Sequence, residues 1–268
     1  MKTYKRVLSI AGSDSGGGAG IQADLKTLSA CGCFAMTAIT AVTAQNTLGV
    51  RTIEPLPVNI IESQIRACLD DIGANAVKIG MLHSVEVIQT VTRVLADYPI
   101  KHIVVDPVMV ATSGDLLVQK EAIAVMQKEL FPLATVITPN TYEIEILSGK
   151  RIQNQDDLYS SIPALKGLGA RGILLKAGHL ECEEITDVLI DCVNNQEYRY
   201  PIKKIDTPNT HGTGCSLSSA VAAYLTHDLP LDKAVEKALN YLYGAIDAAS
   251  DYQIGHGHGA IQHFYKWW

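Results

Sequence analysis

Segment 210–220 carries the strongest chemical signal in this chain of 268 residues, because a glycine-rich turn runs directly into an apolar helical stretch. In the first turn of a helix, the backbone N–H groups lack intrahelical partners and the dipole favours negative charge. The amides of Gly212, Thr213 and Gly214 are therefore predicted to bind an anion such as a phosphate. Cys215 would lie in that turn, where the pKa of a thiol tends to fall. The alternative is an ordinary glycine turn followed by a buried cysteine.

Several polar side chains follow apolar strands elsewhere in the chain. Lys176 closes one such strand, and a lone cation there should reach either a ligand or a carboxylate. Asp106 follows another, where a carboxylate suits a phosphate-bound Mg²⁺, although an aspartate that caps a buried loop is an equal alternative. Asn140 can cap the helix that follows it, and Glu143 would then occupy the third helical position. At that position Glu143 could simply complete the cap.

Two loops in the first third of the chain are also candidates. Segment 11–24 holds five glycines between a strand and a helix, so its backbone can approach a ligand closely. It matches neither the P-loop nor the dinucleotide fingerprint, and a flexible turn is the alternative. Asp24 falls within the helical start, where a lone acid more often complements the dipole. Gln45 ends a strand and can both donate and accept, as an aminopyrimidine edge requires, although a surface turn is slightly favoured.

Short apolar runs alternate with amphipathic stretches along most of the chain. The predicted strands are 6–11, 37–43, 76–81, 102–106, 135–138 and 172–176, and the predicted helices include 58–69, 84–96, 120–130 and 156–168. This alternation predicts an α/β fold of three layers, with helices on both faces of a mostly parallel sheet. After residue 183 the pattern changes to two antiparallel strands, 185–192 and 197–204, and then to helices 215–224 and 231–249. Without a linker or repeat, one domain over residues 1–268 is expected.

Composition excludes some classes of function. The formal net charge is −6 and no basic block is present, which argues against nucleic acid and membrane surfaces as partners. No apolar run approaches the roughly 20 residues that span a bilayer, and the N-terminus lacks the apolar core of a signal peptide. The six cysteines are scattered and suit a reducing compartment, so we expect a cytoplasmic protein.

Taken together, these motifs resemble the hydroxymethylpyrimidine/phosphomethylpyrimidine kinases of thiamin biosynthesis, within the ribokinase-like superfamily. The resemblance covers nearly the whole chain. It rests on AGSDSGGGAGIQADLKT at 11–27, AVTAQNT at 41–47, KIGML at 78–82, DPVM at 106–109, TPN at 138–140, HGTGC at 211–215 and GHGHGAIQHF at 255–264. It implies a ribokinase-like α/β/α fold and ATP-dependent phosphorylation of hydroxymethylpyrimidine and of its monophosphate. A pyridoxal or pyridoxine kinase is the close alternative.

The resemblance also implies roles for individual residues on the substrate side. Gln45 is similar to the residue that holds the pyrimidine edge, and Asp24 is expected near the hydroxymethyl group. The residues that match the ring pocket are Gly12, Ala19, Met81 and Val108. The expected partner is this small-molecule substrate, and a homodimer is compatible with the sequence.

On the nucleotide side, the resemblance implies ATP and Mg²⁺. Lys176 is expected to contact phosphates, Asn140 and Thr213 to contact the nucleotide, and Asp106 and Glu143 to hold the metal. Gly212, Thr213 and Gly214 are similar to an anion hole. Cys215 occupies the position of a catalytic aspartate in sugar kinases, and would either take the hydroxyl proton as a thiolate or orient the hydroxyl.

Two readings from other classes remain. Cys215 with His211 could form the nucleophilic pair of a hydrolase, although Gly212 and Gly214 indicate that His211 precedes the helix. A non-catalytic nucleotide-binding module would keep the anion loop and lose phosphoryl transfer. ATP-dependent formation of a product separates all three readings.

Overall fold

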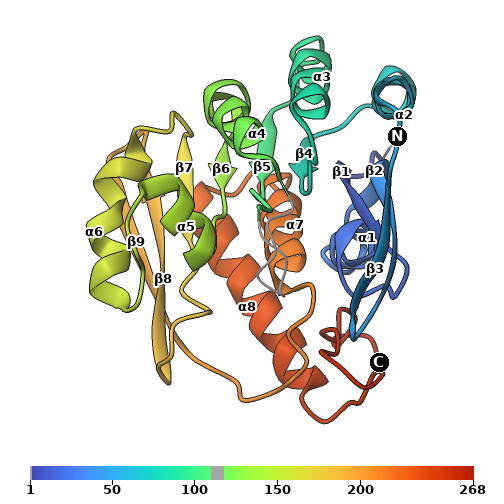
Figure 1. Cartoon of the computed structure of the whole chain (residues 1–268). Coiled ribbons are helices and arrows are strands. Elements are labelled where there is room, and N and C mark those ends of the chain that lie inside the picture. Colours follow the sequence, from blue (N-terminus) through green and yellow to red (C-terminus); the bar gives the residue numbers. More distant parts are fainter. Residues whose placement is uncertain (1, 110–117) are drawn as a thin grey trace.

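The computed structural model describes residues 2–109 and 118–268, and in this part of the chain nine strands form one sheet (Figure 1). The strands are β1 (Arg6–Asp14), β2 (Phe34–Asn46), β3 (Gly49–Pro55), β4 (Ala76–Ile79), β5 (His102–Val105), β6 (Val136–Ile137), β7 (Gly172–Leu175), β8 (Glu184–Asp191) and β9 (Gln196–Lys203). Their order is β3-β2-β1-β4-β5-β6-β7-β8-β9. The six strands from β2 to β7 in that order pair in parallel, whereas β3, β8 and β9 pair antiparallel with their neighbours.

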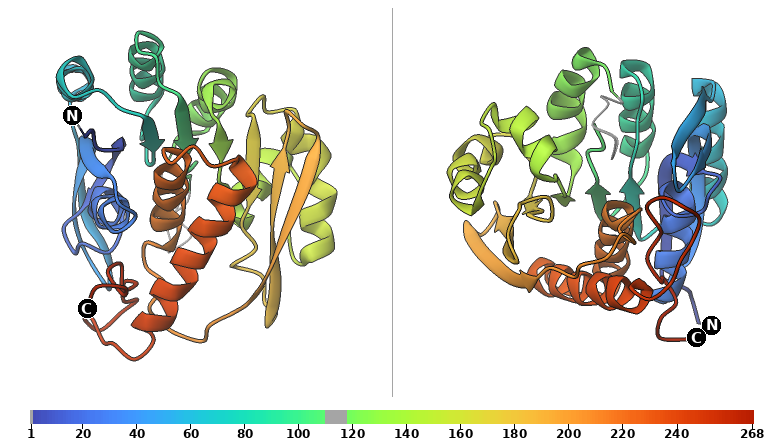
Figure 2. Two further views of the ribbon diagram at one scale, coloured as in Figure 1. Left: turned by 180° about the vertical axis from the view of Figure 1, so that it is seen from behind. Right: turned by 60° about the horizontal axis from the view of Figure 1, so that its bottom comes forward.

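Helices cover both faces of this sheet, which gives three layers (Figure 2). The helices are α1 (Gly20–Ala30), α2 (Val58–Asp71), α3 (Val85–Ala96), α4 (Lys120–Val125), α5 (Thr141–Ser148), α6 (Gln155–Lys166), α7 (Thr213–Leu225) and α8 (Leu231–Ala249). One buried apolar cluster joins the sheet to α1, α7 and α8, and a second joins the opposite face to α2 through α6. The predicted three-layer, mostly parallel α/β fold is confirmed.

The strand pleat decides which side chains reach the face covered by α1 and α7. Both chain neighbours of Ser9 in β1 pack in the cluster beneath α2 and α3, so Ser9 itself points toward α1 and α7. Both chain neighbours of Lys78 in β4 pack in the same way. Ser9 and Lys78 are directly paired in register. A hydroxyl and an ammonium group therefore lie side by side within an otherwise apolar layer.

Some element predictions differ from the structure. Strand β3 was not predicted, because all of its residues are exposed and give no buried-strand signal. The predicted helix 120–130 is divided into α4 and a π-helical turn, Met126–Leu130. Strands β1 and β2 continue three residues beyond their predicted ends, to Asp14 and Asn46. Among residues 2–109 and 118–268, none of the helices is long and apolar enough to cross a membrane.

Candidate active site

The first turn of α7 has the geometry of an anion site. Gly212 is the residue before the helix, with a φ of 79°, and a Cβ there would lie 1.8 Å from the Gly18 carbonyl oxygen. Only glycine fits this left-handed position and this close approach. Ser216 is the first residue to bond back into the helix, to the Gly212 carbonyl at 2.9 Å. The amides of Gly214 and Cys215 therefore have no intrahelical acceptor and are available to an anion.

The hydroxyl and the amide of Thr213 are directed elsewhere. Its Oγ1 donates to the Thr210 carbonyl at 3.0 Å, and its amide approaches the same oxygen at 3.4 Å. The predicted contact of Thr213 with a nucleotide would require these bonds to exchange. The amides of Gly214 and Cys215 are thus free to bind an anion, whereas the Thr213 amide is directed to the Thr210 carbonyl.

Lys176 and Asp106 form an ion pair beneath this turn. Lys176 Nζ lies 2.9 Å from Asp106 Oδ1, and Thr138 donates to the same oxygen at 3.0 Å. A Cβ on Gly214 would lie 3.5 Å from both Lys176 Nζ and Asp106 Oδ2, so the start of α7 sits directly over the pair. Burial alone would raise the pKa of Asp106, but the Lys176 and Lys78 ammonium groups and the bond from Thr138 together outweigh it, and the pKa is lowered. The sequence left either a ligand or a carboxylate as the partner of Lys176, and in the structure that partner is the carboxylate of Asp106.

Asn140 and Glu143 form the capping box that the sequence allows. Asn140 Oδ1 accepts from the Glu143 amide at 3.0 Å, and Glu143 Oε2 accepts from the Asn140 amide at 2.8 Å. The Glu143 carboxyl is buried close to Lys176 and Asp106. Burial raises the pKa of Glu143 to about 7, and the nearby Asp106 carboxylate contributes in the same direction. The capping role is confirmed, and the carboxyl also adjoins the ion pair.

Cys215 lies in the first turn of α7 as predicted, but the expected fall in its pKa is wrong. Burial raises the pKa of the thiol to about 11, more than the nearby Lys78 ammonium lowers it. The amide of Gly20 also directs its N–H toward the sulfur. The helix terminus alone favours a thiolate, but desolvation by the surrounding protein disfavours it by more.

The first glycine-rich loop is held by Asp14. Its carboxylate accepts hydrogen bonds from the amides of Gly16, Gly18 and Ala19 at 2.8–3.0 Å. His211 Nε2 lies 3.0 Å from Asp14 Oδ2, so the imidazole ties this loop to the one before α7. Burial opposes a low pKa for Asp14, but these bonds lower it. His211 precedes α7 as predicted and contacts Asp14, which does not support a hydrolase pair with the thiol.

The residues expected around the ring lie at the carboxyl ends of neighbouring strands. Gly12 is near the end of β1, and a Cβ there would lie 2.8 Å from the Met81 methyl group. Val108 follows β5 and Ala19 precedes α1, and both are partly exposed. Gln45 is in β2 and not in a surface turn, with Oε1 3.2 Å from Thr43 Oγ1. In parallel sheets, ligands bind along this edge.

Asp24 is placed differently from both expectations for it. The first turn of α1 contains no acidic residue, so the dipole-complementing interpretation is wrong. The side chain is fully buried and pairs with Lys78 Nζ, which lies 2.9 Å from both carboxylate oxygens. Without exposed surface, Asp24 cannot touch a ring and lies behind the site. Sequence reasoning missed Lys78, which lies within an apolar strand, although Lys176 was identified because it closes one.

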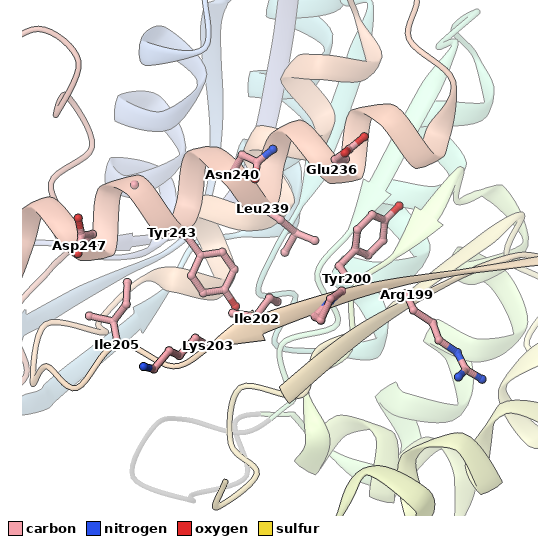
Figure 3. A pocket seen from close by; sticks show the side chains of 12 residues that line it. Arg199, Tyr200, Ile202, Lys203, Ile205, Glu236, Leu239, Asn240, Tyr243 and Asp247 are labelled. Atoms are coloured by element: carbon pink, nitrogen blue, oxygen red, sulfur yellow. The ribbon is translucent and has the colours of Figure 1, made fainter. Parts of the chain in front are cut away.

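A groove of about 610 Å³ runs between β9 and α8 (Figure 3). Tyr200, Leu239 and Tyr243 extend into the space between the strand and the helix. Its remaining lining residues are Arg199, Pro201, Ile202, Lys203, Ile205, Glu236, Asn240, Gly244 and Asp247. None of them is a predicted site residue, but the groove lies on the same half of the sheet as β7, which ends next to Lys176.

Comparison with known proteins is consistent with this geometry. A family described as phosphomethylpyrimidine kinase matches residues 14–262. A hydroxymethylpyrimidine/phosphomethylpyrimidine kinase of Rhizobium meliloti is 47% identical over 262 residues, which cover 97% of each chain.

Two solved structures extend the comparison to the fold. A phosphomethylpyrimidine kinase of Clostridium difficile is 44% identical, with a TM-score of 0.78 over 90% of this chain and 99% of that one. An ADP complex of Bacillus subtilis pyridoxal kinase is 34% identical, with a TM-score of 0.89 over 97% of this chain and 98% of that one. The chain is thus more similar in sequence to the first and more similar in backbone to the second.

Proposed function

The chain belongs to the phosphomethylpyrimidine kinase family, and we propose that it transfers phosphate from ATP to hydroxymethylpyrimidine and then to the resulting monophosphate. The observation that carries this proposal is the Lys176–Asp106 pair beneath the free amides of Gly214 and Cys215. A cation and two amides that converge below a helix dipole suit the charge of a phosphoryl group in transfer. The similarity to the Rhizobium kinase over 97% of the chain supports the substrate class.

The proposed reaction needs positioning more than covalent chemistry. A bond forms between the hydroxyl oxygen and the γ-phosphorus, the bond from phosphorus to ADP breaks, and the hydroxyl proton leaves on the transferred phosphate. Lys176 and the amides of Gly214 and Cys215 hold the moving charge. Because burial keeps Cys215 protonated near neutral pH, its thiol orients the hydroxyl rather than acting as a base.

The ring is proposed to lie between the first glycine-rich loop and Gln45, against Gly12, Ala19, Met81 and Val108. Gln45 has its amide within reach of His211 Nε2 at 3.4 Å, a long contact that a ring edge could replace. The nucleoside of ATP would lie over the other half of the sheet, near Asn140. On the face of the sheet that α8 covers, the groove between β9 and α8 offers the rings of Tyr200 and Tyr243.

Mg²⁺ is part of the proposal, and the donor set suits it. Asp106 and Glu143 supply hard carboxylate oxygens, and from the described residues Asp106 Oδ2 accepts a long contact of 3.4 Å from Ser218. No group of three His, Cys, Asp or Glu side chains gathers as a metal site in the described ranges. These two carboxylates would therefore hold Mg²⁺ together with water and phosphate oxygens, as is common for this ion. When bound, the ion would neutralise phosphate charge.

A pyridoxal or pyridoxine kinase is the second candidate, since the TM-score of 0.89 to the Bacillus subtilis enzyme favours it. One experiment tests both: ADP release is measured with hydroxymethylpyrimidine and with pyridoxine, and the products are identified by mass. The proposal expects mono- and diphosphate from the pyrimidine at a higher kcat/KM than any pyridoxine product. A faster reaction with pyridoxine would favour the second candidate, and ATP-independent turnover would exclude both.

A further inference from the structure

A second buried ion pair, Lys78–Asp24, lies behind the proposed site. Both side chains have an exposed fraction of 0%, and Lys78 Nζ is 2.9 Å from each Asp24 oxygen. A lone charge at this depth would be strongly disfavoured, so each member depends on the other. Burial alone would lower the pKa of Lys78, but the Asp24 carboxylate, together with Cys215 and Asp106, outweighs it and the net pKa is raised. The pair is therefore a fixed element of the interior.

Two hydroxyl groups complete this network and come from different elements. Ser9 in β1 donates to Asp24 Oδ2 at 2.5 Å, and Ser219 in α7 donates to Asp24 Oδ1 at 2.8 Å. Both serines are fully buried. The aspartate of α1 thus bonds to β1, to β4 through Lys78, and to α7 through Ser219. The bond from Ser219 starts one helical turn after Cys215, on the helix whose first amides face the proposed phosphoryl group.

Apolar side chains of similar size would hold these four elements together with less desolvation. A polar network instead fixes direction, because hydrogen bonds and ion pairs are satisfied in only one arrangement. The helix start needs such accuracy, since Gly212 touches the Gly18 carbonyl and the sulfur of Cys215 faces the Gly20 amide. A rotation or slide of α7 by a fraction of an ångström would misdirect the amides of Gly214 and Cys215.

We propose that Lys78, Asp24 and Ser219 are positioning residues for phosphoryl transfer, which hold the start of α7 in register with α1 and β4 from behind the site. This inference rests on the proposed kinase function. It assigns the tie from Lys78 through Asp24 to Ser219 to the accuracy of the anion hole and the thiol rather than to the binding of either substrate. The turnover step should therefore be sensitive to it, and the two KM values should not.

Removal of Lys78 or Asp24 alone leaves a buried charge without its partner, so such variants are expected to lose their fold. The test uses Ser219→Ala, which breaks only the tie to α7. Its matched control is Ser9→Ala, which removes a bond to the same carboxylate from an equally buried serine in β1. We expect Ser219→Ala to lower kcat about 10- to 100-fold, as for small misplacements in active sites, with both KM values within about twofold. Ser9→Ala should keep kcat within about twofold of the parent at a similar loss of Tm.

Hydrogen exchange supplies a readout that does not depend on activity. The amide of Ser216, which donates to the Gly212 carbonyl at the start of α7, should exchange faster in Ser219→Ala than in Ser9→Ala. Equal kcat losses in the two variants, parental kcat in Ser219→Ala, or a change confined to KM would each overturn the proposal. If the parent formed no phosphorylated product, the proposed function would fail, whereas the exchange rates would still show whether Ser219 orders the start of α7.

Discussion

Two lysine–aspartate pairs with the same separation of 2.9 Å lie against α7, and they differ in exposure. The side chains of Lys176 and Asp106 are 12% and 3% exposed, whereas those of Lys78 and Asp24 are 0% exposed. Consecutive serines of α7 reach them. Ser218 lies 3.4 Å from Asp106, and Ser219 lies 2.8 Å from Asp24.

This difference in exposure gives the two lysine–aspartate pairs different roles. The open pair, Lys176–Asp106, can exchange part of its mutual attraction for a phosphate or a metal ion that arrives from solvent. The closed pair, Lys78–Asp24, has no path to a ligand, so its interactions are complete within the fold. A buried ion pair can therefore contact a ligand directly only where part of it is exposed to the site.

The largest effect should come from the open pair. Lys176→Gln removes the cation but keeps a donor for Asp106, so we expect kcat to fall about 100- to 1,000-fold with a small change in Tm. Steady-state kinetics with ATP and the pyrimidine measure this. Lys204→Gln is the matched control, because the Lys204 ammonium bonds to the Leu180 carbonyl. Parental kinetics for Lys176→Gln would remove the distinction between the two pairs.

Cys215 lies close to charges of both pairs, and its variants test whether the thiol orients the substrate hydroxyl or acts as a base. Since burial raises its pKa to about 11, we expect an orienting role and a fall in kcat of about 100-fold for Cys215→Ala. Cys215→Ser keeps a hydroxyl that can orient the substrate, and should retain about a tenth or more of parental kcat. A serine variant as slow as the alanine variant would instead indicate that the sulfur acts as a base.

The sequence singled out both members of the open pair without predicting that they contact each other, and it missed the closed pair. Lys176 stood out because it ends a strand, whereas Lys78 lies within a strand and was included only as part of a motif. The partner of a buried lysine cannot be identified from one sequence, because Asp24 lies 54 positions away on a helix. The parallel sheet was predictable from long apolar runs. Strand β3 was not, because its residues are exposed and pair only with β2.

The behaviour of Cys215 had a similar limit. The first turn of a helix is visible in sequence, and with it the tendency toward a low pKa. Burial outweighs this tendency, and the carboxylates of Asp24 and Asp106, which are distant from Cys215 in sequence, also raise the pKa of the thiol. Local motifs thus predicted where the thiol lies, and tertiary packing decided its protonation.

Glu143, which adjoins the open pair, should make the free energy of unfolding depend on pH. Burial raises the pKa of Glu143 from 4.5 to about 7. Because the folded state holds this proton more tightly, the contribution is fully present below pH 4.5 and is lost as pH rises through about 7. Without nucleotide and Mg²⁺, the free energy of unfolding should fall by up to about 3 kcal/mol across this window. Urea unfolding of Glu143→Gln should show a flatter profile, and Glu145→Gln on the same helix is the control.

The smallest effect is expected at Gln45, which belongs to neither pair and should change binding rather than turnover. Its amide reaches Thr43 Oγ1 and His211 Nε2 at 3.2 and 3.4 Å, so both ends have long contacts that a pyrimidine edge could replace. A donor or acceptor left unpaired costs about 1–3 kcal/mol, so Gln45→Leu should raise the pyrimidine KM about 10- to 100-fold.

The KM for ATP and the kcat at saturating pyrimidine should stay within about twofold of the parent. Gln64→Leu is the matched control, because the Gln64 amide bonds both backbone groups of Ile39, on the same strand as Gln45. If Gln45→Leu instead raised the KM for ATP and left the pyrimidine KM unchanged, Gln45 would belong to the nucleotide side. The proposed division of the sheet into a ring half and a phosphate half, with the start of α7 between them, would then be reversed.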